Sequence, residues 1–471
     1  MEVKKLYING EWVASHSDAV IEVESPINHQ ILGIVPAGDE VDVNLAVSAA
    51  RAAFVPWWEL GKDARCEYLM KFKEELTRAM DDIAALIVLE LGTNARNAVG
   101  IHIKGYVNAI QEYVGFAKSE DWFLREKDYI IAREPFGVVA GITPWNYPLG
   151  QIISKMVPAL IAGNTFVLKP SRQTPLTAIM IAEAAHRAGL PKGVFNLVTG
   201  RGGEVGDVLA KHPDVDLLSF TGSTAGGKQV YQIAAASTGK KVIMELGGKS
   251  PAVLLDPDYY EKGVKNVLSL LFSNVGQTCA AWSRLIVPRK DLKQIEEMVV
   301  KACARFEFGD PRTGDRVVGP LASRKQFDKV ASYISKGVAE GAKLILGREY
   351  ESYEGSYQIG ATIFSDVDNS MSIAQDEIFG PVLCIIPYDT EEEALEIAND
   401  TIYGLSGVVF GEPEKALEFA GKIRSGEVSI NGNYSRYETP FGGYKQSGIG
   451  REGSKFGLDE YLEIKTIHVG E

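Results

Sequence analysis

The spacing of hydrophobic positions changes several times along the chain, and each change predicts a different kind of element. The first forty residues hold short strand-like runs broken by Asn-Gly, Ser-Pro and Ala-Gly turns. From residue 40 to about 115, apolar residues recur three and four positions apart, which predicts amphipathic helices. Residues 122–133 then alternate between apolar and polar side chains, and this alternation predicts an extended ribbon.

Four nearly continuous apolar runs follow residue 137, namely G-V-V-A-G-I, T-F-V-L-K, G-V-F-N-L-V and D-L-L-S-F. Helical segments at 149–162, 174–188 and about 203–211 separate them. Apolar strands that alternate with helices are typical of a parallel sheet covered on both faces. Such sheets bind ligands at the carboxyl ends of their strands. Small or polar groups follow these strands, in T-P-W-N, K-P-S, T-G-R-G-G and T-G-S-T.

A second set of strands begins after residue 241 with K-V-I-M-E-L-G-G, P-A-V-L-L, R-L-I-V-P and P-V-L-C-I-I-P-Y. Helical patterns at 260–274 and 292–306 accompany it. We therefore expect a second α/β domain that starts near residue 245. Two further strands, E-V-S-I-N-G-N and D-E-Y-L-E-I-K-T-I-H-V-G, flank a glycine-rich loop.

Length and charge narrow the class of protein. At roughly 150 residues per domain, the 471 residues suggest about three folding units. Lys and Arg number 49 against 62 Asp and Glu, a net charge of −13, which argues against nucleic acid as a partner. The first residues contain no apolar signal region and no run approaches the length of a membrane span. We expect a cytoplasmic protein without a membrane partner.

The four cysteines lie far apart in the sequence and form no C-x-x-C pair, and the six histidines form no H-x-H or H-E-x-x-H. We therefore expect reduced thiols and no metal site. Cys66, Cys303 and Cys384 fall in helical or apolar runs, where packing is the natural role. Cys279 has small neighbours in N-V-G-Q-T-C-A-A-W, which leave a sulfur accessible. From the residues alone, this thiol is either reactive or another packing residue.

The glycine-rich turn at 221–228, T-G-S-T-A-G-G-K, contains the G-x-x-x-x-G-K of a phosphate-binding P-loop. Gln229 stands where that motif needs Ser or Thr for Mg²⁺, so a simpler turn that offers backbone N–H groups to a phosphate is favoured. The dinucleotide fingerprint G-x-G-x-x-G is incomplete, because Val205 follows Gly200 and Gly202 in its third place. A conventional Rossmann dehydrogenase is not supported.

Three polar residues stand at the ends of apolar runs. Glu245 is either paired structurally or kept as a base with a raised pKa, and the two glycines after it predict close backbone approach. Asn146 is either a turn residue held by its prolines or an amide donor to a developing negative charge. Lys169 closes its strand, where a solvated end-cap is the alternative to a ligand contact.

Seven motifs occur in one order along the chain: T-P-W-N-Y-P, L-K-P-S, F-T-G-S, M-E-L-G-G-K-S-P, G-Q-T-C, E-I-F-G-P and P-F-G-G-Y-K-Q-S-G. Together they resemble the aldehyde dehydrogenase superfamily over essentially the whole chain. The resemblance implies an α/β fold with two doubly wound domains, one for the cofactor and one for catalysis, plus a small β element for oligomerisation. The cofactor-binding domain would comprise 1–116 and 136–244, the ribbon 117–135 and 460–471, and the catalytic domain 245–459. A homodimer or homotetramer is implied.

The same resemblance assigns roles within the site. Cys279 would be the nucleophile and Glu245 the general base, with Asn146 and the Cys279 backbone N–H forming the oxyanion hole. NAD or NADP would be held by Thr143, Trp145, Lys169, Arg172, Gly202, Gly222, Ser223, Glu377 and Phe379, with Glu377 on the nicotinamide ribose. Lys155 and Glu452 would relay protons. The aldehyde pocket would be lined by Tyr147, Ser154, Thr278, Ala280, Ser435 and Phe441.

The implied reaction suits these residue types. A thiolate attacks a small-molecule aldehyde, two hydrogen-bond donors stabilise the oxyanion, and hydride passes to the nicotinamide. Water activated by Glu245 then hydrolyses the thioester. A P-loop ATPase is the alternative of another class, and Gln229 opposes it. A non-catalytic relative is a third reading, and the intact Cys279, Glu245 and Asn146 oppose that one.

Two residues depart from the pattern of the family. The C-terminal S-G-I-G-R-E-G-S-K-F-G resembles succinate-semialdehyde dehydrogenases, yet Ser154 stands where those enzymes carry a substrate-binding arginine. This difference argues against a dicarboxylate semialdehyde as substrate. Arg172 replaces the Glu of the usual L-K-P-S-E run, at a position that selects between NAD and NADP.

Overall fold

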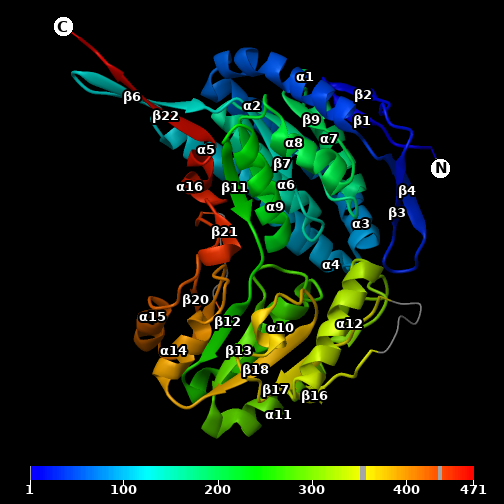
Figure 1. Cartoon of the computed structure of the whole chain (residues 1–471), viewed down its shortest axis with the longest axis vertical. Coiled ribbons are helices and arrows are strands. Elements are labelled where there is room, and N and C mark those ends of the chain that lie inside the picture. The colour runs from blue at the N-terminus through cyan, green and yellow to red at the C-terminus, as the bar shows by residue number, and fades with distance from the viewer. Residues whose placement is uncertain (1, 351–356, 433–437, 471) are drawn as a thin grey trace.

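The computed structural model describes residues 2–350, 357–432 and 438–470. Two lobes, each built on its own mostly parallel sheet, lie one above the other in Figure 1, and a thin ribbon projects from the upper lobe. The two doubly wound units and the small β element expected from the sequence are therefore present.

The sheet of the first lobe has eight strands in the order β2-β1-β9-β8-β7-β10-β11-β21. Its strands are β1 (Leu6–Ile8), β2 (Glu11–Val13), β7 (Val138–Ile142), β8 (Thr165–Lys169), β9 (Phe195–Leu197), β10 (Leu217–Thr221), β11 (Lys241–Glu245) and β21 (Gly448–Ile449). The five strands from β9 to β11 in this order are parallel, and four of them, β7 to β10, are the continuous apolar runs predicted to form such a sheet. The run K-V-I-M-E-L-G-G, grouped from the sequence with the second set of strands, forms β11 and pairs with β10 of this first sheet. In the pairing of β10 with β11, Thr221 lies beside Glu245, so both residues stand at the same carboxyl edge.

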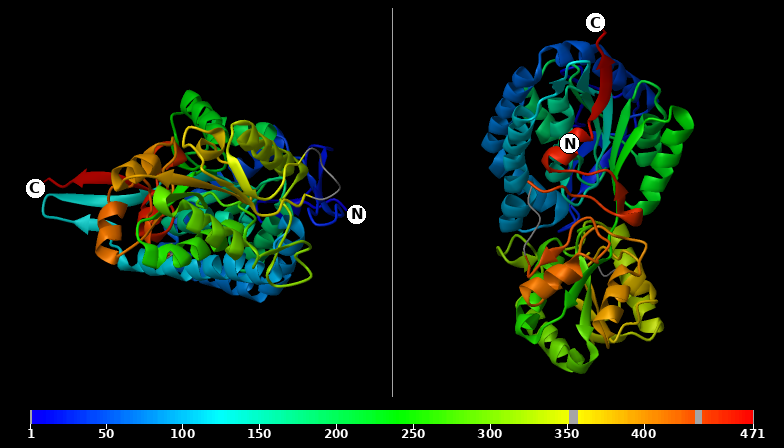
Figure 2. Two further views of the ribbon diagram at one scale, coloured as in Figure 1. Left: turned by 90° about the horizontal axis from the view of Figure 1, so that it is seen from below. Right: turned by 90° about the vertical axis from the view of Figure 1, so that its left-hand side faces the viewer.

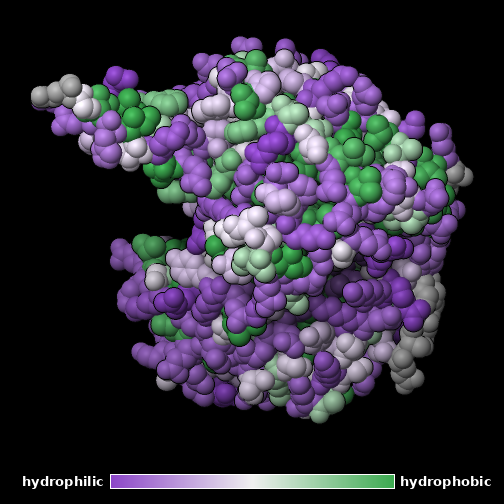
Figure 3. All heavy atoms as spheres, turned by 45° about the horizontal axis from the view of Figure 1, so that its top comes forward, coloured by the Kyte–Doolittle hydropathy of each residue, from purple (hydrophilic) through white to green (hydrophobic). Residues whose placement is uncertain are grey.

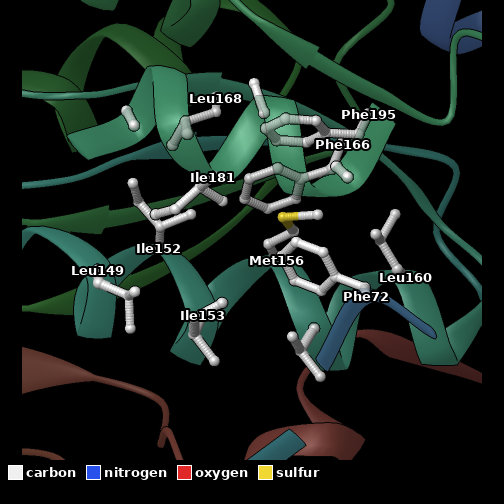
Figure 4. Packing of buried hydrophobic residues seen from close by; sticks show 14 of the residues in the cluster. Phe72, Leu149, Ile152, Ile153, Met156, Leu160, Phe166, Leu168, Ile181 and Phe195 are labelled. Atoms are coloured by element: carbon white, nitrogen blue, oxygen red, sulfur yellow. The ribbon is translucent and has the colours of Figure 1, made fainter. Parts of the chain in front are cut away.

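Helices cover both faces of this sheet. They are α1 (Glu40–Glu59), α2 (Lys62–Arg78), α3 (Met80–Leu91), α4 (Ala95–Asn97), α5 (Lys104–Ser119), α6 (Pro148–Ala162), α7 (Pro175–Arg187), α8 (Asp207–Lys211), α9 (Thr224–Ser237) and α16 (Ser454–Asp459), with π-helical turns η1 (Ala98–Ile103) and η2 (Gly202–Gly206). Figure 4 shows α6 between Phe72 of α2 and Phe166 of β8, where Met156 fills the space between the two rings. Neighbouring residues of β8 face opposite layers, Phe166 toward one apolar cluster and Val167 toward the other.

The sheet of the second lobe has seven strands in the order β16-β17-β18-β13-β12-β19-β20, all parallel except β16. They are β12 (Ser250–Leu254), β13 (Trp282–Pro288), β16 (Lys343–Leu346), β17 (Thr362–Ser365), β18 (Val382–Tyr388), β19 (Val408–Phe410) and β20 (Ser429–Ile430). The helices around it are α10 (Tyr260–Ser273), α11 (Leu292–Cys303), α12 (Arg324–Ala339), α13 (Ser372–Gln375), α14 (Glu391–Asn399) and α15 (Pro413–Ala420). Its own apolar cluster contains none of the residues of the first lobe's clusters.

Smaller elements complete the fold. They are the hairpin β3 (Val20–Glu24) and β4 (Ile31–Pro36), the pair β14 (Glu307–Phe308) and β15 (Val317–Val318), and the 3₁₀ turns η3 (Pro257–Tyr259), η4 (Arg289–Asp291) and η5 (Lys445–Ser447). The ribbon consists of β5 (Phe123–Arg125), β6 (Tyr129–Pro135) and β22 (Leu462–His468), in the order β22-β6-β5. It extends beyond the body in the left view of Figure 2, with the C-terminus at its outer end.

The end of the chain returns to the first lobe. Strand β21 pairs antiparallel with β11, which sets Gly448 beside Glu245, and α16 packs against α5 and α6. Within the segment 245–459, this stretch therefore lies against the first sheet. That path brings Glu452 from the distant end of the sequence to Lys155 of α6.

Candidate active site

The predicted nucleophile differs from the other cysteines in its surroundings. Cys279 is partly exposed, whereas Cys66, Cys303 and Cys384 are buried, as their sequence settings indicated. Cys279 lines a cavity of about 310 Å³. Burial raises the pKa of its thiol, and the nearby carboxylates of Glu377 and Glu245 raise it further. These surroundings favour the protonated form of the thiol.

The loop that carries the nucleophile is held by a buried network of amides. The Asn274 side chain donates to the backbone carbonyl of Asn146 at 3.0 Å and to that of Gln277 at 3.2 Å. Asn146 in turn donates its own Nδ2 to the Gln277 carbonyl at 3.1 Å, and Gln277 accepts from the N–H of Ala322 at 2.9 Å. The arrangement fixes the predicted oxyanion donor Asn146 to the nucleophile loop. Sequence reasoning missed Asn274 and Gln277, although both stand in the same N-V-G-Q-T-C motif.

The backbone of this loop is strained at one position. Val275, a β-branched residue, has a φ of 57°, and the following Gly276 has a φ of 73°. A Cβ at Gly276 would lie 1.9 Å from the carbonyl oxygen of Gly380, so only glycine fits there. The turn before Cys279 therefore packs closely against the E-I-F-G-P loop that carries Glu377.

The two glycines after Glu245 permit two close approaches, as the sequence predicts. A Cβ at Gly247 would lie 2.7 Å from a carboxylate oxygen of Glu377, and a Cβ at Gly248 would lie 2.4 Å from the carbonyl oxygen of Cys279. The backbone N–H of Gly248 also donates to Glu377 at 3.1 Å. This turn therefore lies in direct contact with Cys279, the predicted nucleophile, and with Glu377, the predicted ribose ligand. It directly follows Glu245, the predicted base.

Glu245 is the residue of the site with the most unusual environment. Its side chain is buried, and within the described chain neither carboxylate oxygen has a hydrogen-bond partner. Burial raises its pKa well above the ordinary value, and the charge of Glu452 raises it further, while Lys155 and Arg451 act in the opposite direction. A buried carboxyl with free oxygens suits a proton acceptor better than a structural ion pair.

Lys155 and Glu452 form an ion pair behind this carboxyl. Both side chains are buried, and the Lys155 ammonium also donates to the hydroxyl of Thr221 at 2.6 Å. Glu452 lines the cavity that contains Cys279. The charges of both residues act on Glu245, so the residues predicted to relay protons lie around the predicted base.

The residues expected to hold the adenosine half of the cofactor lie at the carboxyl ends of β7, β8 and β10. Lys169 ends β8 and is buried, and burial followed by the charge of Arg172 lowers its pKa to about 8. Arg172 itself is exposed. Thr143, which follows β7, has a buried hydroxyl with no partner among the described residues. These groups offer two cations and a free hydroxyl to a nucleotide.

A glycine-rich turn stands beside them. Gly222 follows β10 directly, and Ser223 caps α9 by accepting from the N–H of Gly226 at 3.2 Å. Gly202 starts the π-helical turn η2, where the space around its Cα is open. The Lys228 side chain donates to Gln446, and that of Gln229 to Asp207. Neither residue is directed to a phosphate as the corresponding residues of a P-loop would be, while the N-terminus of α9 retains its affinity for anions.

The nicotinamide end is expected at Glu377 and Phe379. Burial raises the pKa of Glu377, against the opposing charge of Lys329. Phe379 has a φ of 64° and contacts Trp145 edge to face, with ring centroids 5.5 Å apart. The side-chain amide of Gln326 donates to the Phe379 carbonyl at 2.7 Å and holds this turn. The residues predicted for the nicotinamide end therefore stand on a loop that packs against the turn before Cys279.

The substrate cavity contains five of the six predicted pocket residues, namely Tyr147, Ser154, Thr278, Ala280 and Phe441. Ser435 lies outside the described residues. Sequence reasoning missed further lining residues, among them Tyr106, Tyr113, Gln151, Trp282, Glu427 and Ser429. Helical spacing could have found Gln151, because Tyr147, Gln151 and Ser154 recur four and three residues apart. Strand alternation could have linked Glu427 to Ser429.

Metal-binding side-chain groups and membrane-spanning helices were also considered among the described residues. In the described ranges, no group of three or more His, Cys, Asp or Glu side chains is arranged to hold a metal ion. Among the same residues, no helix is both long and apolar enough to cross a membrane.

The first lobe is doubly wound and carries predicted cofactor residues at the carboxyl edge of its sheet. The second lobe presents a thiol near the buried carboxyl of Glu245. These features define an oxidoreductase with covalent thiol chemistry. The model of the aldehyde dehydrogenase family matches residues 12–467, and the chain belongs to this family. The chain is 44% identical over 471 residues to a 3-succinoylsemialdehyde-pyridine dehydrogenase from a Pseudomonas species, with 99% of this chain and 98% of the relative covered.

Solved structures agree. Aldehyde dehydrogenase C of Pseudomonas syringae, in complex with NAD⁺ and octanal, superposes with a TM-score of 0.96 at 42% identity, covering 98% of this chain and 96% of that one. Betaine aldehyde dehydrogenase of Staphylococcus aureus, in complex with NAD⁺, gives 0.95 at 35% identity, covering 99% and 94%.

The predicted family, fold class and reaction are confirmed. The chain is an NAD(P)-dependent dehydrogenase that oxidises an aldehyde to the carboxylic acid. The P-loop ATPase and the non-catalytic relative are therefore set aside.

Proposed function

We propose that this enzyme oxidises uncharged aldehydes with an aromatic or extended apolar body, through a covalent intermediate on Cys279. The observation that carries the proposal is the composition of the cavity around Cys279. Five aromatic residues line it, namely Tyr106, Tyr113, Tyr147, Trp282 and Phe441. Rings of this kind bury large apolar surfaces and orient them.

The charged groups of the cavity argue against an anionic substrate. Among the described residues, Glu427 and Glu452 are its charged lining residues, Glu452 is paired with Lys155, and Ser154 supplies no cation on the face of α6. A carboxylate on the substrate would find no cation among these lining residues, which is unfavourable. The names of two relatives fit this proposal, because one acts on a pyridine semialdehyde and another was crystallised with octanal.

In the first step, Cys279 loses its proton and its sulfur attacks the carbonyl carbon of the aldehyde. This proton leaves to solvent, and the free oxygens of Glu245 are kept for the last step. The negative charge on the former carbonyl oxygen is stabilised by the Asn146 amide and the backbone N–H of Cys279. Asn274 keeps that amide in place through its bond to the Asn146 carbonyl.

NAD(P), when bound, accepts the hydride that turns the thiohemiacetal into a thioester. Lys169, Ser223 and the turn at Gly222 would hold its adenosine and phosphates, while Glu377 and Phe379 would hold the nicotinamide half. We propose that Thr143, Trp145, Arg172 and Gly202 complete this site.

The last step is hydrolysis of the thioester. Glu245 takes a proton from water, the resulting hydroxide attacks the acyl carbon, and the Cys279 thiolate leaves. The proton then passes from Glu245 toward Glu452, whose pair with Lys155 and Thr221 opens on the cavity. The carboxylic acid leaves ionised at neutral pH.

The ribbon supports an assembly of two or four copies. Its strands expose large apolar side chains, with 51% of Phe123, 48% of Leu124 and 72% of Ile464 accessible to solvent. Figure 3 shows hydrophobic atoms along this projecting arm. An unpaired strand edge with apolar side chains favours a partner strand. Light scattering at micromolar concentration should give the mass of a dimer or tetramer, and a monomer would contradict the proposal.

Two further proposals concern place and organisation. The four cysteines are all free thiols, which fits a reducing compartment such as the cytoplasm. We also propose that the cofactor-binding domain, the ribbon and the catalytic domain have the limits inferred from the sequence, with the stretch from β21 through α16 returning to the first lobe.

The test is a panel of aldehydes followed by formation of the reduced cofactor. Octanal and aromatic aldehydes should be oxidised with a higher kcat/KM than succinic semialdehyde. Cys279→Ala should retain less than about 1% of the wild-type activity, because loss of a nucleophile costs several orders of magnitude. Cys303→Ala, which removes a buried thiol far from the cavity, should remain active. Equal activity of Cys279→Ala and wild type would contradict the assignment.

A further inference from the structure

A second large cavity lies next to the catalytic one. It has a volume of about 380 Å³ and is formed between α4 of the first lobe and α10 with the segment after α11 of the second. Four cationic side chains line it, namely Arg96, Lys265, Arg305 and Arg316. We call it the arginine cleft. None of the residues assigned to the reaction or to the cofactor belongs to it.

The charge of this cleft is unusual for the chain. The whole protein carries a net charge of −13, yet Asp315 is the one carboxylate that lines the cleft. Lys265 pairs with Glu261 at 2.6 Å. Across the described residues, Arg96, Arg305 and Arg316 have no side-chain hydrogen bond and no ion pair. All three side chains are exposed, and Arg305 also lies within electrostatic reach of Glu261. Together the guanidinium groups around this cavity attract an anion.

The walls between the cations are apolar. Leu268 and Phe272 of α10, together with Phe306 and Ile101, line the same cavity. Asn97 also lines it, but its amide already donates to the Ser273 carbonyl at 2.8 Å. The cleft therefore combines an apolar wall with guanidinium groups, and this combination suits a carboxylate with a short apolar body better than an inorganic anion.

The arginine cleft adjoins the catalytic cavity. Ile101 lines both cavities, and α10 contributes Leu268 and Ser269 to the cleft and Leu270 to the catalytic cavity. A ligand that leaves the catalytic cavity past Ile101 thus meets the cationic side chains directly.

We propose that the arginine cleft binds organic carboxylates and receives the acid product of the reaction. This assignment rests on the proposed function, in which a neutral aldehyde becomes an anion inside a cavity that carries Glu427 and Glu452. The anion finds no cation among the described lining residues of that cavity, and the neighbouring guanidinium groups attract it. The cleft therefore draws the product away from the catalytic carboxylates and keeps the cavity free for the next aldehyde.

The test measures binding of octanoate by calorimetry, with uncharged octanamide as the matched probe. In the triple variant Arg96→Gln, Arg305→Gln, Arg316→Gln, the Kd for octanoate should rise at least about tenfold, which equals about 1.4 kcal/mol. The control variant Lys4→Gln, Lys5→Gln, Lys290→Gln has the same change of charge on exposed residues outside the cleft and should bind octanoate as wild type does. Octanamide should bind weakly to all three proteins.

A second variant separates the two cavities. Ser154→Trp fills part of the catalytic cavity and should lower aldehyde oxidation while octanoate still binds. If octanoate binding is lost in Ser154→Trp and kept in the triple arginine variant, the anion occupies the catalytic cavity and the proposal is wrong. Unsaturable binding to wild type also contradicts it.

Kinetics then identify the source of the carboxylate. If the product leaves through the cleft, added octanoate fills the cleft and slows product release, so the inhibition constant of octanoate rises in the triple arginine variant while kcat/KM for octanal stays the same. If kcat/KM for succinic semialdehyde falls and octanoate inhibition is unchanged, an anionic substrate uses the cleft and the product assignment is wrong. Octanoate binding without any aldehyde oxidation would instead overturn the proposed function and leave the anion site standing.

Discussion

The backbone of Gly248 lies directly against the carbonyl group of Cys279. A Cβ at this position would stand 2.4 Å from the Cys279 oxygen, closer than side-chain atoms pack, and 3.2 Å from the Cβ of Leu405. The nucleophile therefore has its position partly because residue 248 has no side chain. The same turn begins at Glu245, so one short segment sets the distance between base and nucleophile.

Gly248→Ala should displace the Cys279 loop and lower kcat by about 100-fold, because misplacement of reacting groups by about 1 Å has effects of that size. The measurement is steady-state oxidation of octanal, together with the melting temperature. Gly115→Ala is the matched control, since no atom would lie within 4 Å of its Cβ. That helical glycine on α5 should tolerate alanine with unchanged activity. Wild-type kcat in Gly248→Ala would show that the loop adapts.

The close contact at Gly248 illustrates which parts of the site could be predicted. Apolar runs that alternate with helical patterns predicted β7 to β10 as strands of a parallel sheet, and the double glycine after Glu245 predicted close approach. These features depend on neighbours in the sequence. The charged neighbours of Glu245 could not be predicted in this way, because Glu452 comes near it only when β21, from the far end of the chain, pairs with β11.

Other features were out of reach for the same reason. The arginine cleft joins residues 96, 265, 305 and 316 from separate elements, and no local pattern links them. Asn274 is different, since it stands five residues before Cys279, but its bond to the Asn146 carbonyl connects the two lobes and becomes visible only in the fold. Motifs supplied the reacting groups, while the groups that position them came from the structure.

Glu245→Gln should separate acylation from deacylation. If hydrolysis of the thioester needs the base, the variant releases one burst of reduced cofactor and then turns over slowly. Rapid mixing with octanal and cofactor measures the burst. Loss of the burst together with turnover would show that Glu245 is needed earlier, as the acceptor of the Cys279 proton, or for the structure itself.

The raised pKa of Glu245 can be tested independently of activity, through the pH dependence of protein stability. In the unfolded chain a Glu loses its proton near a pKa of about 4.3, whereas the folded protein holds the proton to higher pH because the site is buried. Between those two values the unfolded state binds fewer protons, so stability falls as pH rises. The melting temperature of Glu245→Gln relative to wild type should therefore increase with pH. A constant difference across this range would contradict the raised pKa.

Asn274→Asp tests the amide network behind the oxyanion donor. The substitution keeps the shape of the side chain but replaces the donor that reaches the carbonyls of Asn146 and Gln277. Loss of these buried bonds costs about 1–3 kcal/mol, and kcat should fall while the affinity for cofactor is kept. Asn108→Ala, on the exposed side of α5, is the control and should have normal kcat. A change in the KM for the cofactor alone would show that Asn274 does not act by positioning Asn146.

We expect the cofactor preference to depend on Arg172, which lies beside the end of β8. In NAD-preferring members of the family, this place carries a Glu that accepts a hydrogen bond from the 2′-hydroxyl of the adenosine ribose and repels a 2′-phosphate. A guanidinium cannot accept that bond, but it pairs with a phosphate bidentately. Lys169 lies close enough for the charge of Arg172 to contribute to lowering its pKa to about 8. Two adjacent cations favour a phosphate between them.

We therefore expect the enzyme to accept NADP at least as well as NAD, and Arg172→Glu to shift kcat/KM toward NAD. The pH dependence gives a second test, because Lys169 is charged below its pKa of about 8 and neutral above it. The KM for NADP should rise as pH increases through this value, while the KM for NAD, which carries no 2′-phosphate, should change less. Arg172→Gln removes the cation without adding a carboxylate and should have an intermediate preference. If wild type favours NAD by more than about 100-fold, equal to about 2.7 kcal/mol, and Arg172→Glu changes nothing, then Arg172 has no part in selecting the cofactor.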